Sequence, residues 1–251
     1  MMKAQRINAI HEHVKENNSV SLDELVDLFD VSKNTIRRDV QELVDEEKLT
    51  KVYGGVSISK PLTIPYQDRK VKQLYEKQQL AQVAAEFVED GDIIFIDSGT
   101  TTVEMLDFIK HKNITIVTNN LDFTLDASYY PNLSIYSTGG VFDRSIRSYV
   151  GTESAETIQK YNFNKAFLAS TGLSINKGIT NSSPLETQVK ANVIQKSEQV
   201  FILVDQTKFN KYALTTYCDF NDIDYLITNQ EPPEEYIKHS EQNKYKVLYP
   251  K

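Results

Sequence analysis

Hydrophobic residues recur at helical spacing in three stretches at the start of the chain. Residues 4–17 are expected to form a first helix, because their aliphatic residues fall on one face. A short second helix is expected after Ser21, which has the spacing of a capping box with Glu24. A third is expected to begin after Ser32, a favoured N-cap residue. Two helices joined by a tight turn predict a helix-turn-helix.

The third expected helix is polar on the face opposite its apolar stripe. Such side chains can bond base edges and phosphates. Residues 48–59 follow at once, and two β-prone runs around Gly54 and Gly55 predict a hairpin, or wing. We expect DNA contacts from the cap, the polar face and the wing, namely Ser32, Lys33, Asn34, Thr35, Arg37, Arg38, Lys51 and Tyr53. The alternative is a three-helix packing module with a solvated basic face. The cap, the box and the wing together favour DNA binding.

A polar stretch with two prolines, residues 61–75, separates this segment from the remainder. Proline fixes φ and removes a donor, so the stretch is expected to be a linker. Its Arg69, Lys70 and Lys72 either touch phosphate or are solvated, and the solvated interpretation is favoured. The expected organisation is a DNA-binding domain over residues 1–60, this linker, and a ligand-binding and oligomerisation domain over residues 76–251.

Short, continuous apolar runs alternate with helix-like segments in the larger part. Runs of this kind are typical of strands buried on both faces of a parallel sheet. The expected strands are 93–96, 114–117, 133–136, 166–169, 200–204 and 225–227. The fold class is therefore α/β with a mainly parallel sheet, preceded by a winged helix-turn-helix.

Small polar residues follow five of these strands. Ligands of parallel sheets bind beyond the carboxyl ends of the strands. The loop 97–102, Asp-Ser-Gly-Thr-Thr-Thr, offers a glycine, hydroxyl groups and N–H groups at a helix start, which suit a phosphate. Each turn alone is ordinary turn chemistry, but five in register favour a small-molecule pocket. The loop is neither a Walker motif nor a dinucleotide fingerprint.

Charge and composition limit the classes of function that the sequence allows. The net charge of −7 gives no support for a nucleic-acid binder, so DNA binding has to rest on local placement of charge. The single cysteine forms no internal disulfide, and no Cys/His cluster has metal-ligand spacing. No cofactor or metal is expected. No apolar run approaches the roughly 20 residues that span a bilayer, which favours a cytoplasmic protein without membrane contact.

The chain resembles the DeoR-type bacterial transcription regulators along nearly its whole length. The N-terminal match is Ser32, Thr35 to Val40, and Val52 to Gly55. The later match comprises Asp97–Thr101, Thr118-Asn119, Gly139-Gly140, Val150-Gly151 and Thr207-Lys208-Phe209. The family's effector domains are similar to ribose-5-phosphate isomerases. Thr207 stands where serine is commoner, and Asn229 where the family has an aspartate, which puts any role of that carboxylate in doubt.

The resemblance implies a site for a phosphorylated sugar or sugar acid. Residues 98–102 and Lys208 would hold the phosphate, and Asp97, Asn119, Glu186 and Lys190 would lie near the sugar. Glu186 and Lys190 have an alternative as an ordinary surface i,i+4 pair. The full expected effector set is Asp97, Ser98, Gly99, Thr100, Thr101, Thr102, Asn119, Gly139, Gly140, Gly172, Glu186, Lys190, Asp205 and Lys208.

Several runs are also similar to the repressors of myo-inositol catabolism within this family. They are 31–39, 51–56, 95–102, 147–151 and 178–182. The favoured function is thus a repressor of a carbohydrate operon that binds operator DNA as a dimer or tetramer and is released by a phosphorylated intermediate. The resemblance of these runs implies an inositol operon. The alternatives are a phosphosugar isomerase with a DNA-binding module, for which no histidine lies in a strand-end turn, and a dimerising scaffold.

Overall fold

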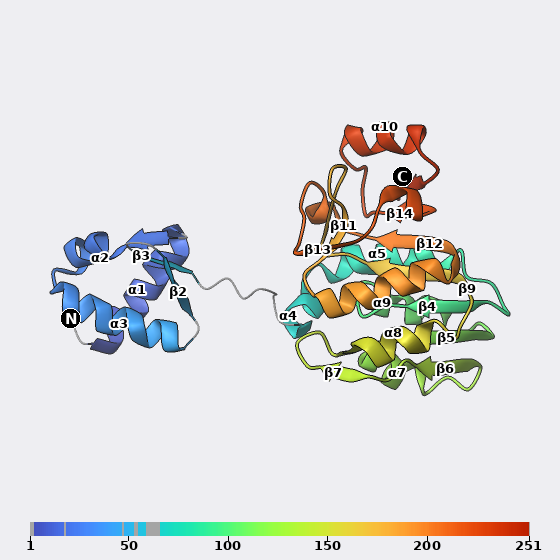
Figure 1. Ribbon diagram of the computed structural model, residues 1–251, viewed down its shortest axis with the longest axis horizontal. Helices are drawn as coiled ribbons and strands as arrows, with labels where there is room; N and C mark the ends of the chain where they lie inside the picture. The colour runs from blue at the N-terminus through green and yellow to red at the C-terminus, as the bar shows by residue number, and fades with distance from the viewer. Residues whose placement is uncertain (1–2, 18, 47, 53–54, 59–65, 251) are drawn as a thin grey trace. The chain divides into compact units, whose positions relative to one another are not determined.

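The computed structural model describes residues 3–17, 19–46, 48–52, 55–58 and 66–250. The chain divides into two compact units, Met1–Thr63 and Ile64–Lys251, and each is described by itself (Figure 1).

Three helices form the N-terminal unit, and two of them begin at the expected serine caps. They are α1 (Lys3–Asn17), α2 (Leu22–Phe29) and α3 (Lys33–Asp45). Ser21 accepts a hydrogen bond from the Glu24 N–H at 3.0 Å, and Ser32 accepts one from the Thr35 N–H at 3.2 Å. Both predicted N-caps are confirmed. A side-chain acceptor at this position satisfies one of the N–H groups that a helix start leaves unpaired.

The expected hairpin follows α3. Strand β2 (Leu49–Val52) pairs antiparallel with β3 (Gly55–Ile58), and β1 (Ser19–Ser21) pairs with the other side of β3. A Cβ atom at Gly55 would overlap the Val20 carbonyl, so this register requires glycine. Tyr53, the expected wing contact, lies outside the described residues.

The three helices and the hairpin enclose one small core. Its buried side chains include Ile10, Leu25, Ile36 and Leu43, which come from all three helices. An ion pair joins α1 to α3, with Nε of the partly buried Arg6 2.6 Å from Oδ2 of the buried Asp39.

The second unit is built on a seven-stranded parallel sheet with the order β15-β14-β12-β9-β4-β5-β6. All six predicted strands are present, and β15 is an addition. The strands are β4 (Ile93–Ile96), β5 (Ile114–Thr118), β6 (Leu133–Ser137), β9 (Phe163–Ala169), β12 (Ser197–Leu203), β14 (Tyr225–Ile227) and β15 (Lys246–Leu248). The predicted α/β class is confirmed.

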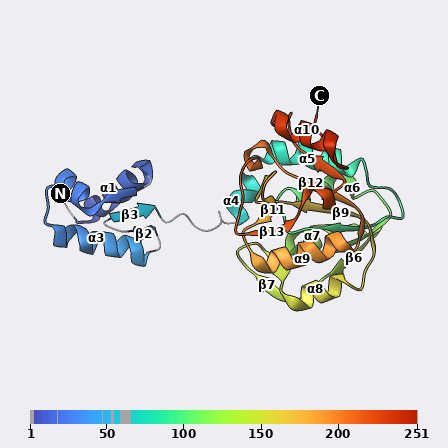
Figure 2. The same cartoon turned by 45° about the horizontal axis from the view of Figure 1, so that its top comes forward.

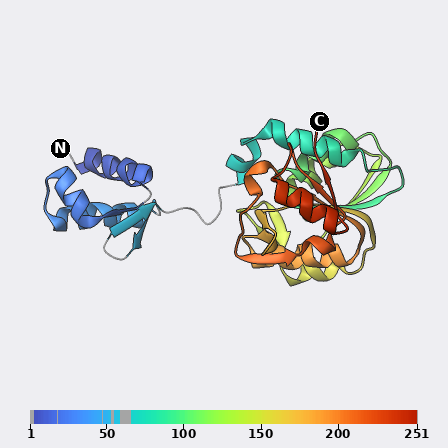
Figure 3. The same ribbon diagram turned by 90° about the horizontal axis from the view of Figure 1, so that it is seen from above.

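Helices cover both faces of this sheet (Figures 2 and 3). Ile94 and Ile96 of β4 pack into a core with α5, α6 and α7, whereas Phe95 packs into the core on the opposite face. Side chains of a strand alternate between faces, so a continuous apolar run fits a sheet buried on both sides. The helices are α5 (Leu74–Ala85), α6 (Leu106–Ile109), α7 (Leu121–Ala127), α8 (Thr152–Ile158), α9 (Pro184–Gln195) and α10 (Glu234–Gln242), with 3-10 turns η1 (Thr102–Met105), η2 (Gln206–Lys208) and η3 (Phe220–Asp222).

Two small antiparallel sheets were not predicted. One pairs β7 (Val141–Asp143) with β8 (Ser148–Val150), and the other has the order β10-β11-β13, with β10 (Gly172–Ser174), β11 (Gly178–Asn181) and β13 (Thr215–Cys218).

Cys218 is buried, and this burial raises the pKa of its thiol. No helix within the described residues is long and apolar enough to cross a membrane.

Part of the expected linker is ordered against the second unit. Helix α4 (Tyr66–Val71) lies inside residues 61–75, and the Tyr66 side chain is buried. The Lys77 ammonium group on α5 donates a hydrogen bond to the Arg69 carbonyl at the end of this short helix. Residues 61–65 lie outside the described part of the chain.

Candidate functional site

The polar face of α3 is open to solvent. Lys33, Asn34, Arg37 and Arg38 are exposed, and Thr35 is partly buried beside the Ser32 hydroxyl group, 2.9 Å away. Within the described residues, neither the Arg37 nor the Arg38 side chain makes an ion pair or a hydrogen bond. Two unpaired guanidinium groups on an exposed helix are able to meet guanine edges or phosphates without first breaking a contact.

The other expected cations of this unit are already engaged. Lys33 Nζ lies 2.5 Å from Asp23 Oδ1, and the Lys51 ammonium group donates to the Gln41 side chain. These contacts are at the surface and weak, so DNA phosphates can replace them at low cost. The sequence analysis did not identify the pair of Arg6 with Asp39. This pair fixes α3 on α1 and thereby orients the arginine face.

The expected phosphate loop follows β4 and leaves donors unused. Among the described residues, the backbone N–H groups of Ser98, Thr100 and Thr101 have no protein acceptor. A Cβ atom at Gly99 would lie 2.5 Å from the Ala169 Cβ atom, so the loop passes too close to β9 for any larger residue. Adjacent unpaired N–H groups at the start of a helical turn form a site that suits an anion.

Asp97 holds this loop in place. Its Oδ1 accepts bonds from the Gly99 N–H at 2.9 Å and from the Thr102 hydroxyl, and its Oδ2 accepts one from the Ala169 N–H at 2.9 Å. Lys190 Nζ lies 3.0 Å from Oδ2 and donates to the Ala169 carbonyl at 2.6 Å. Asp97 and Thr102 were expected to contact the ligand. In the structure their side-chain oxygens bond the chain itself.

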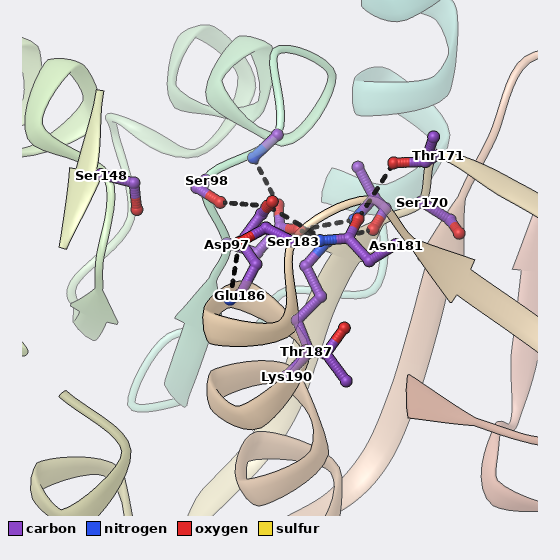
Figure 4. Close-up of polar contacts among 12 residues, drawn as sticks. Asp97, Ser98, Ser148, Ser170, Thr171, Asn181, Ser183, Glu186, Thr187 and Lys190 are labelled. Carbon is purple, nitrogen blue, oxygen red and sulfur yellow. Dashed lines mark hydrogen bonds and ion pairs between the residues drawn. The ribbon is translucent and has the colours of Figure 1, made fainter. Parts of the chain in front are cut away.

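Glu186 and Lys190 point from α9 into the same cluster (Figure 4). Glu186 Oε1 accepts a bond from the Ser98 hydroxyl at 3.0 Å and lies 3.8 Å from Lys190 Nζ. The side chains are only 11% and 4% exposed, which rules out the alternative of a surface pair. Ser183 caps α9 by accepting from the Glu186 N–H at 3.4 Å. Buried charges of this kind are paired and hydrogen-bonded, because isolated ones are costly.

Two lysines of the second unit have lowered pKa values. Burial lowers the pKa of Lys77 to about 8, while Glu104 raises it and Arg69 lowers it further. Burial also lowers the pKa of Lys208, with Asp205 acting in the opposite direction and Arg69 adding to the shift. A bound anion would favour the charged form of both groups. Lys208 was predicted as a site residue, but Lys77 was missed. Lys77 lies three residues before Leu80 and seven before Ala84, so it falls on the apolar face of α5. A lysine on an apolar face is unusual, and this position could have identified it from the sequence.

The remaining expected residues lie at strand ends, and most have structural contacts. Asn119 follows β5 and is buried. Gly139 and Gly140 follow β6 with φ of 63° and 104°, and a Cβ atom on Gly140 would come 2.9 Å from the Val150 carbonyl oxygen. A Cβ atom on Gly172 would come 2.7 Å from the Lys211 carbonyl oxygen. Asp205 caps η2 by accepting from the Thr207 N–H at 2.8 Å.

The sequence analysis also missed Asn181. It ends β11, a strand that no apolar run predicted, and its amide nitrogen is buried without a partner among the described residues. Figure 4 shows its side chain directed toward Lys190 and Asp97, with Thr171 on its other side. Within the described part of the chain, no group of three or more His, Cys, Asp or Glu residues could hold a metal ion.

A winged helix-turn-helix with a free arginine face, joined to an α/β unit with an anion-suited loop, defines the class of ligand-responsive DNA-binding regulators. Two family models match the chain. A DeoR-like helix-turn-helix domain covers residues 6–61, and a DeoR C terminal sensor domain covers residues 72–230. The chain belongs to the DeoR family of transcriptional regulators.

Curated relatives match over nearly the full length. The chain is 41% identical to the HTH-type transcriptional regulator IolR of Bacillus subtilis, over 95% of this chain and 96% of that protein. It is 31% identical to the glycerol-3-phosphate regulon repressor of Escherichia coli, over 93% of both chains. It is 29% identical to the lactose phosphotransferase system repressor of Staphylococcus aureus, over 93% of this chain and 95% of that protein.

Solved structures give more distant matches. A D-ribose-5-phosphate isomerase in complex with phospho-erythronic acid matches with a TM-score of 0.40 and 16% identity, over 53% of this chain and 52% of that chain. The eIF2B beta subunit of Chaetomium thermophilum matches with a TM-score of 0.47 and 13% identity, over 85% of this chain and 59% of that chain.

Proposed function

We propose that this regulator represses a carbohydrate catabolism operon and that a phosphorylated sugar or sugar acid releases it from its operator. The observation that carries the proposal is the loop 98–101, where three N–H groups have no acceptor among the described residues. The same unit holds two lysines with lowered pKa values, the buried Lys77 and the partly buried Lys208. Donors and cations in this arrangement complement a phosphoryl group. The buried cluster of Asp97, Glu186 and Lys190 lies next to the loop and suits the hydroxyl groups of a sugar.

The relatives support both halves of the proposal. Two of them are named as repressors, one of a glycerol-3-phosphate regulon and one of a lactose phosphotransferase system. The similarity of several runs to myo-inositol repressors makes a phosphorylated product of inositol breakdown the first effector to test. All of these relatives are named as regulators, so we infer that the chain acts as a regulator and not as an isomerase.

The proposed release is a shift between two states of a homo-oligomer. A dimer of helix-turn-helix units reads half-sites about 10 base pairs apart, or multiples of that distance. The effector moves the protein away from the DNA-binding state only as far as it binds the other state more tightly. The α3 arginines supply the DNA contact, and the loop 98–101 supplies the difference in effector affinity.

The test begins with a duplex that the full-length protein selects from a random-sequence library. Titration of this duplex with Arg37→Ala and Arg38→Ala should show weaker binding, by roughly 5–150-fold for a lost guanine contact worth about 1–3 kcal/mol. Lys15→Ala, on the exposed side of α1, is the matched control and should change affinity far less. Unchanged binding by both arginine variants would remove α3 from the recognition surface.

The effector half is tested on the same complex. Phosphosugars, their unphosphorylated forms and inorganic phosphate are added, and dissociation of the duplex is measured. We expect at least one phosphorylated compound to release the protein at a concentration where its unphosphorylated form does not. Release by unphosphorylated sugars alone would contradict the phosphate assignment of the loop 98–101. Turnover of any phosphosugar by the purified protein would revive the isomerase alternative.

A further inference from the structure

Asn181 lies at the edge of the charged cluster (Figure 4). It is the last residue of β11 and is 3% exposed. Its backbone carbonyl accepts a bond from the Thr215 hydroxyl at 3.0 Å, and Thr215 is its register partner on β13. The next helix, α9, begins three residues later and carries Glu186 and Lys190. The position of Asn181 is therefore fixed by the same elements that place the cluster.

One half of the Asn181 side chain is engaged and the other half is not. Its Oδ1 accepts a bond from the Thr171 hydroxyl at 3.1 Å, which turns the amide nitrogen toward Lys190 and Asp97 (Figure 4). That nitrogen is buried and has no acceptor among the described residues. Since an unpaired buried donor costs free energy, a native structure seldom keeps one without a use. The amide is positioned as a donor toward the site.

A complementary group lies on the other side of Asp97. Asn119 follows β5, and its amide nitrogen donates to the Tyr149 carbonyl at 3.1 Å, whereas its Oδ1 is buried without a donor among the described residues. The sheet order places β4 and its loop between β5 and β9, so Asn119 and Thr171 flank the Asp97 loop from opposite sides. The site thus presents an unused donor and an unused acceptor, both uncharged, in addition to the anion loop.

We propose that Asn181 is a specificity-determining residue, whose amide N–H group donates to an oxygen of the effector away from its phosphate. The inference rests on the proposed function and deepens it. It defines the effector class as a phosphorylated compound with hydroxyl or carbonyl oxygens along its chain. Hydroxyl groups both donate and accept, so such a chain satisfies Asn181 and Asn119 together. A compound that lacks the oxygen beside Asn181 leaves the donor unpaired and binds more weakly.

The experiment measures dissociation constants of the full-length protein for inorganic phosphate and for a panel that contains glucose 6-phosphate, fructose 6-phosphate, 6-phosphogluconate, glycerol 3-phosphate and 2-deoxyglucose 6-phosphate. The variants are Asn181→Ala, Asn181→Asp and Thr171→Val. For the tightest phosphosugar, Asn181→Ala should lose about 10-fold in affinity. Asn181→Asp should lose more, because it adds a third carboxylate beside Asp97 and Glu186. Thr171→Val should lose less, because the amide remains but is no longer oriented.

Inorganic phosphate separates a role in recognition from a role in folding. Its affinity should change by less than about twofold in all three variants, since the hydrogen bond is made to the other end of the effector. Asn192→Asp removes an amide donor of α9 that bonds the Ala155 carbonyl; it is the matched control and should leave the order of the panel unchanged. Asn181→Asp keeps the shape of the side chain and serves if the alanine variant fails to fold.

The outcomes distinguish this inference from the proposed function. Parallel loss of phosphate and phosphosugar binding in the Asn181 variants would overturn the inference, because it would show a purely structural role. Unchanged phosphosugar affinity in all Asn181 variants would overturn it as well, while the proposed function would stand. If the wild-type protein binds neither phosphate nor any phosphosugar, the proposed function fails, and the inference fails with it.

Discussion

The two candidate sites of this chain are built in opposite ways. Arg37 and Arg38 are exposed and unpaired among the described residues, whereas Asp97, Glu186 and Lys190 are buried and bonded to one another. A surface that meets a large polyanion needs charges that are ready at the start of binding. A site that encloses a small ligand needs side chains that are already held in place, so its charged groups are bonded to one another and to the backbone before the ligand binds. In the N-terminal unit, the residues expected to contact DNA can be identified by their exposed charges. In the second unit, the residues expected to contact the effector can be identified by hydrogen-bond donors that have no protein acceptor.

The largest expected effect tests the buried frame. Lys190→Met leaves the Asp97 carboxylate buried without its cation, and the loss of one partner of a buried pair costs about 3–5 kcal/mol. Urea unfolding followed by circular dichroism should therefore show the second unit destabilised by this amount. The transition of the N-terminal unit should not move, because the bonding partners of Lys190 among the described residues, such as Asp97 and Ala169, belong to the second unit.

Two controls sharpen that result. Lys110→Met removes an exposed i,i+3 partner of Asp107 and should cost at most about 0.5 kcal/mol. Arg38→Ala should likewise change the unfolding free energy by less than about 0.5 kcal/mol while it weakens DNA binding. A Lys190→Met variant as stable as the wild type would show that the charged groups of the second unit do not depend on one another for stability.

A smaller effect is expected from the charge of Lys77. Its pKa of about 8 lies below the ordinary value, so the ammonium form is lost as the pH rises through 8. The phosphate of a ligand is already dianionic above pH 7. If the lysine has to be charged to bind it, affinity should fall about tenfold between pH 7 and pH 9. The lowered pKa of Lys208 acts in the same direction.

The check is a series of calorimetric titrations with a phosphosugar at several pH values. Lys77→Arg keeps the charge over this range, so it should flatten the profile, whereas Lys77→Met should weaken binding at every pH. The proposed DNA contacts of Arg37 and Arg38 use guanidinium groups, which stay charged over this range, so duplex binding should not follow this profile. A wild-type affinity that is constant from pH 7 to pH 9 would show that the lysine does not hold the phosphate.

The smallest effects come from a matched pair of helix caps. Ser32→Ala and Ser183→Ala each remove a side-chain acceptor from a helix start, which costs about 1 kcal/mol. Differential scanning calorimetry should show the first change in the N-terminal unit and the second in the other unit. The first should weaken duplex binding and the second phosphosugar binding. If Ser32→Ala weakened phosphosugar binding, or Ser183→Ala weakened duplex binding, the assignment of one ligand to each unit would be wrong.

Sequence patterns predicted the architecture well because they are local. Apolar runs such as 93–96 and 114–117 are typical of strands covered on both faces, and the serine caps depend on a few adjacent residues. The antiparallel sheets around β7 and β11 escaped detection, since their strands are three or four residues long and lack apolar alternation.

Roles of individual residues were harder to predict than their positions. Asp97 belongs to the expected loop, but only the coordinates show that both its oxygens bond the chain. Asn181 lies 84 positions from Asp97 in the sequence, and no local pattern indicates that its amide is unpaired. Burial and hydrogen-bond satisfaction depend on contacts between distant segments, which a pattern of neighbours does not contain.

Cys218 gives the protein a practical property. It is the sole cysteine of the sequence, it is buried, and the raised pKa of its thiol keeps it in the unreactive protonated form. A cysteine introduced at an exposed position, such as Lys51 of β2 or Leu214 before β13, would therefore react with a maleimide dye long before the native thiol. Energy transfer between one dye in each unit would then report how the distance between the two dyes changes when metabolites are added.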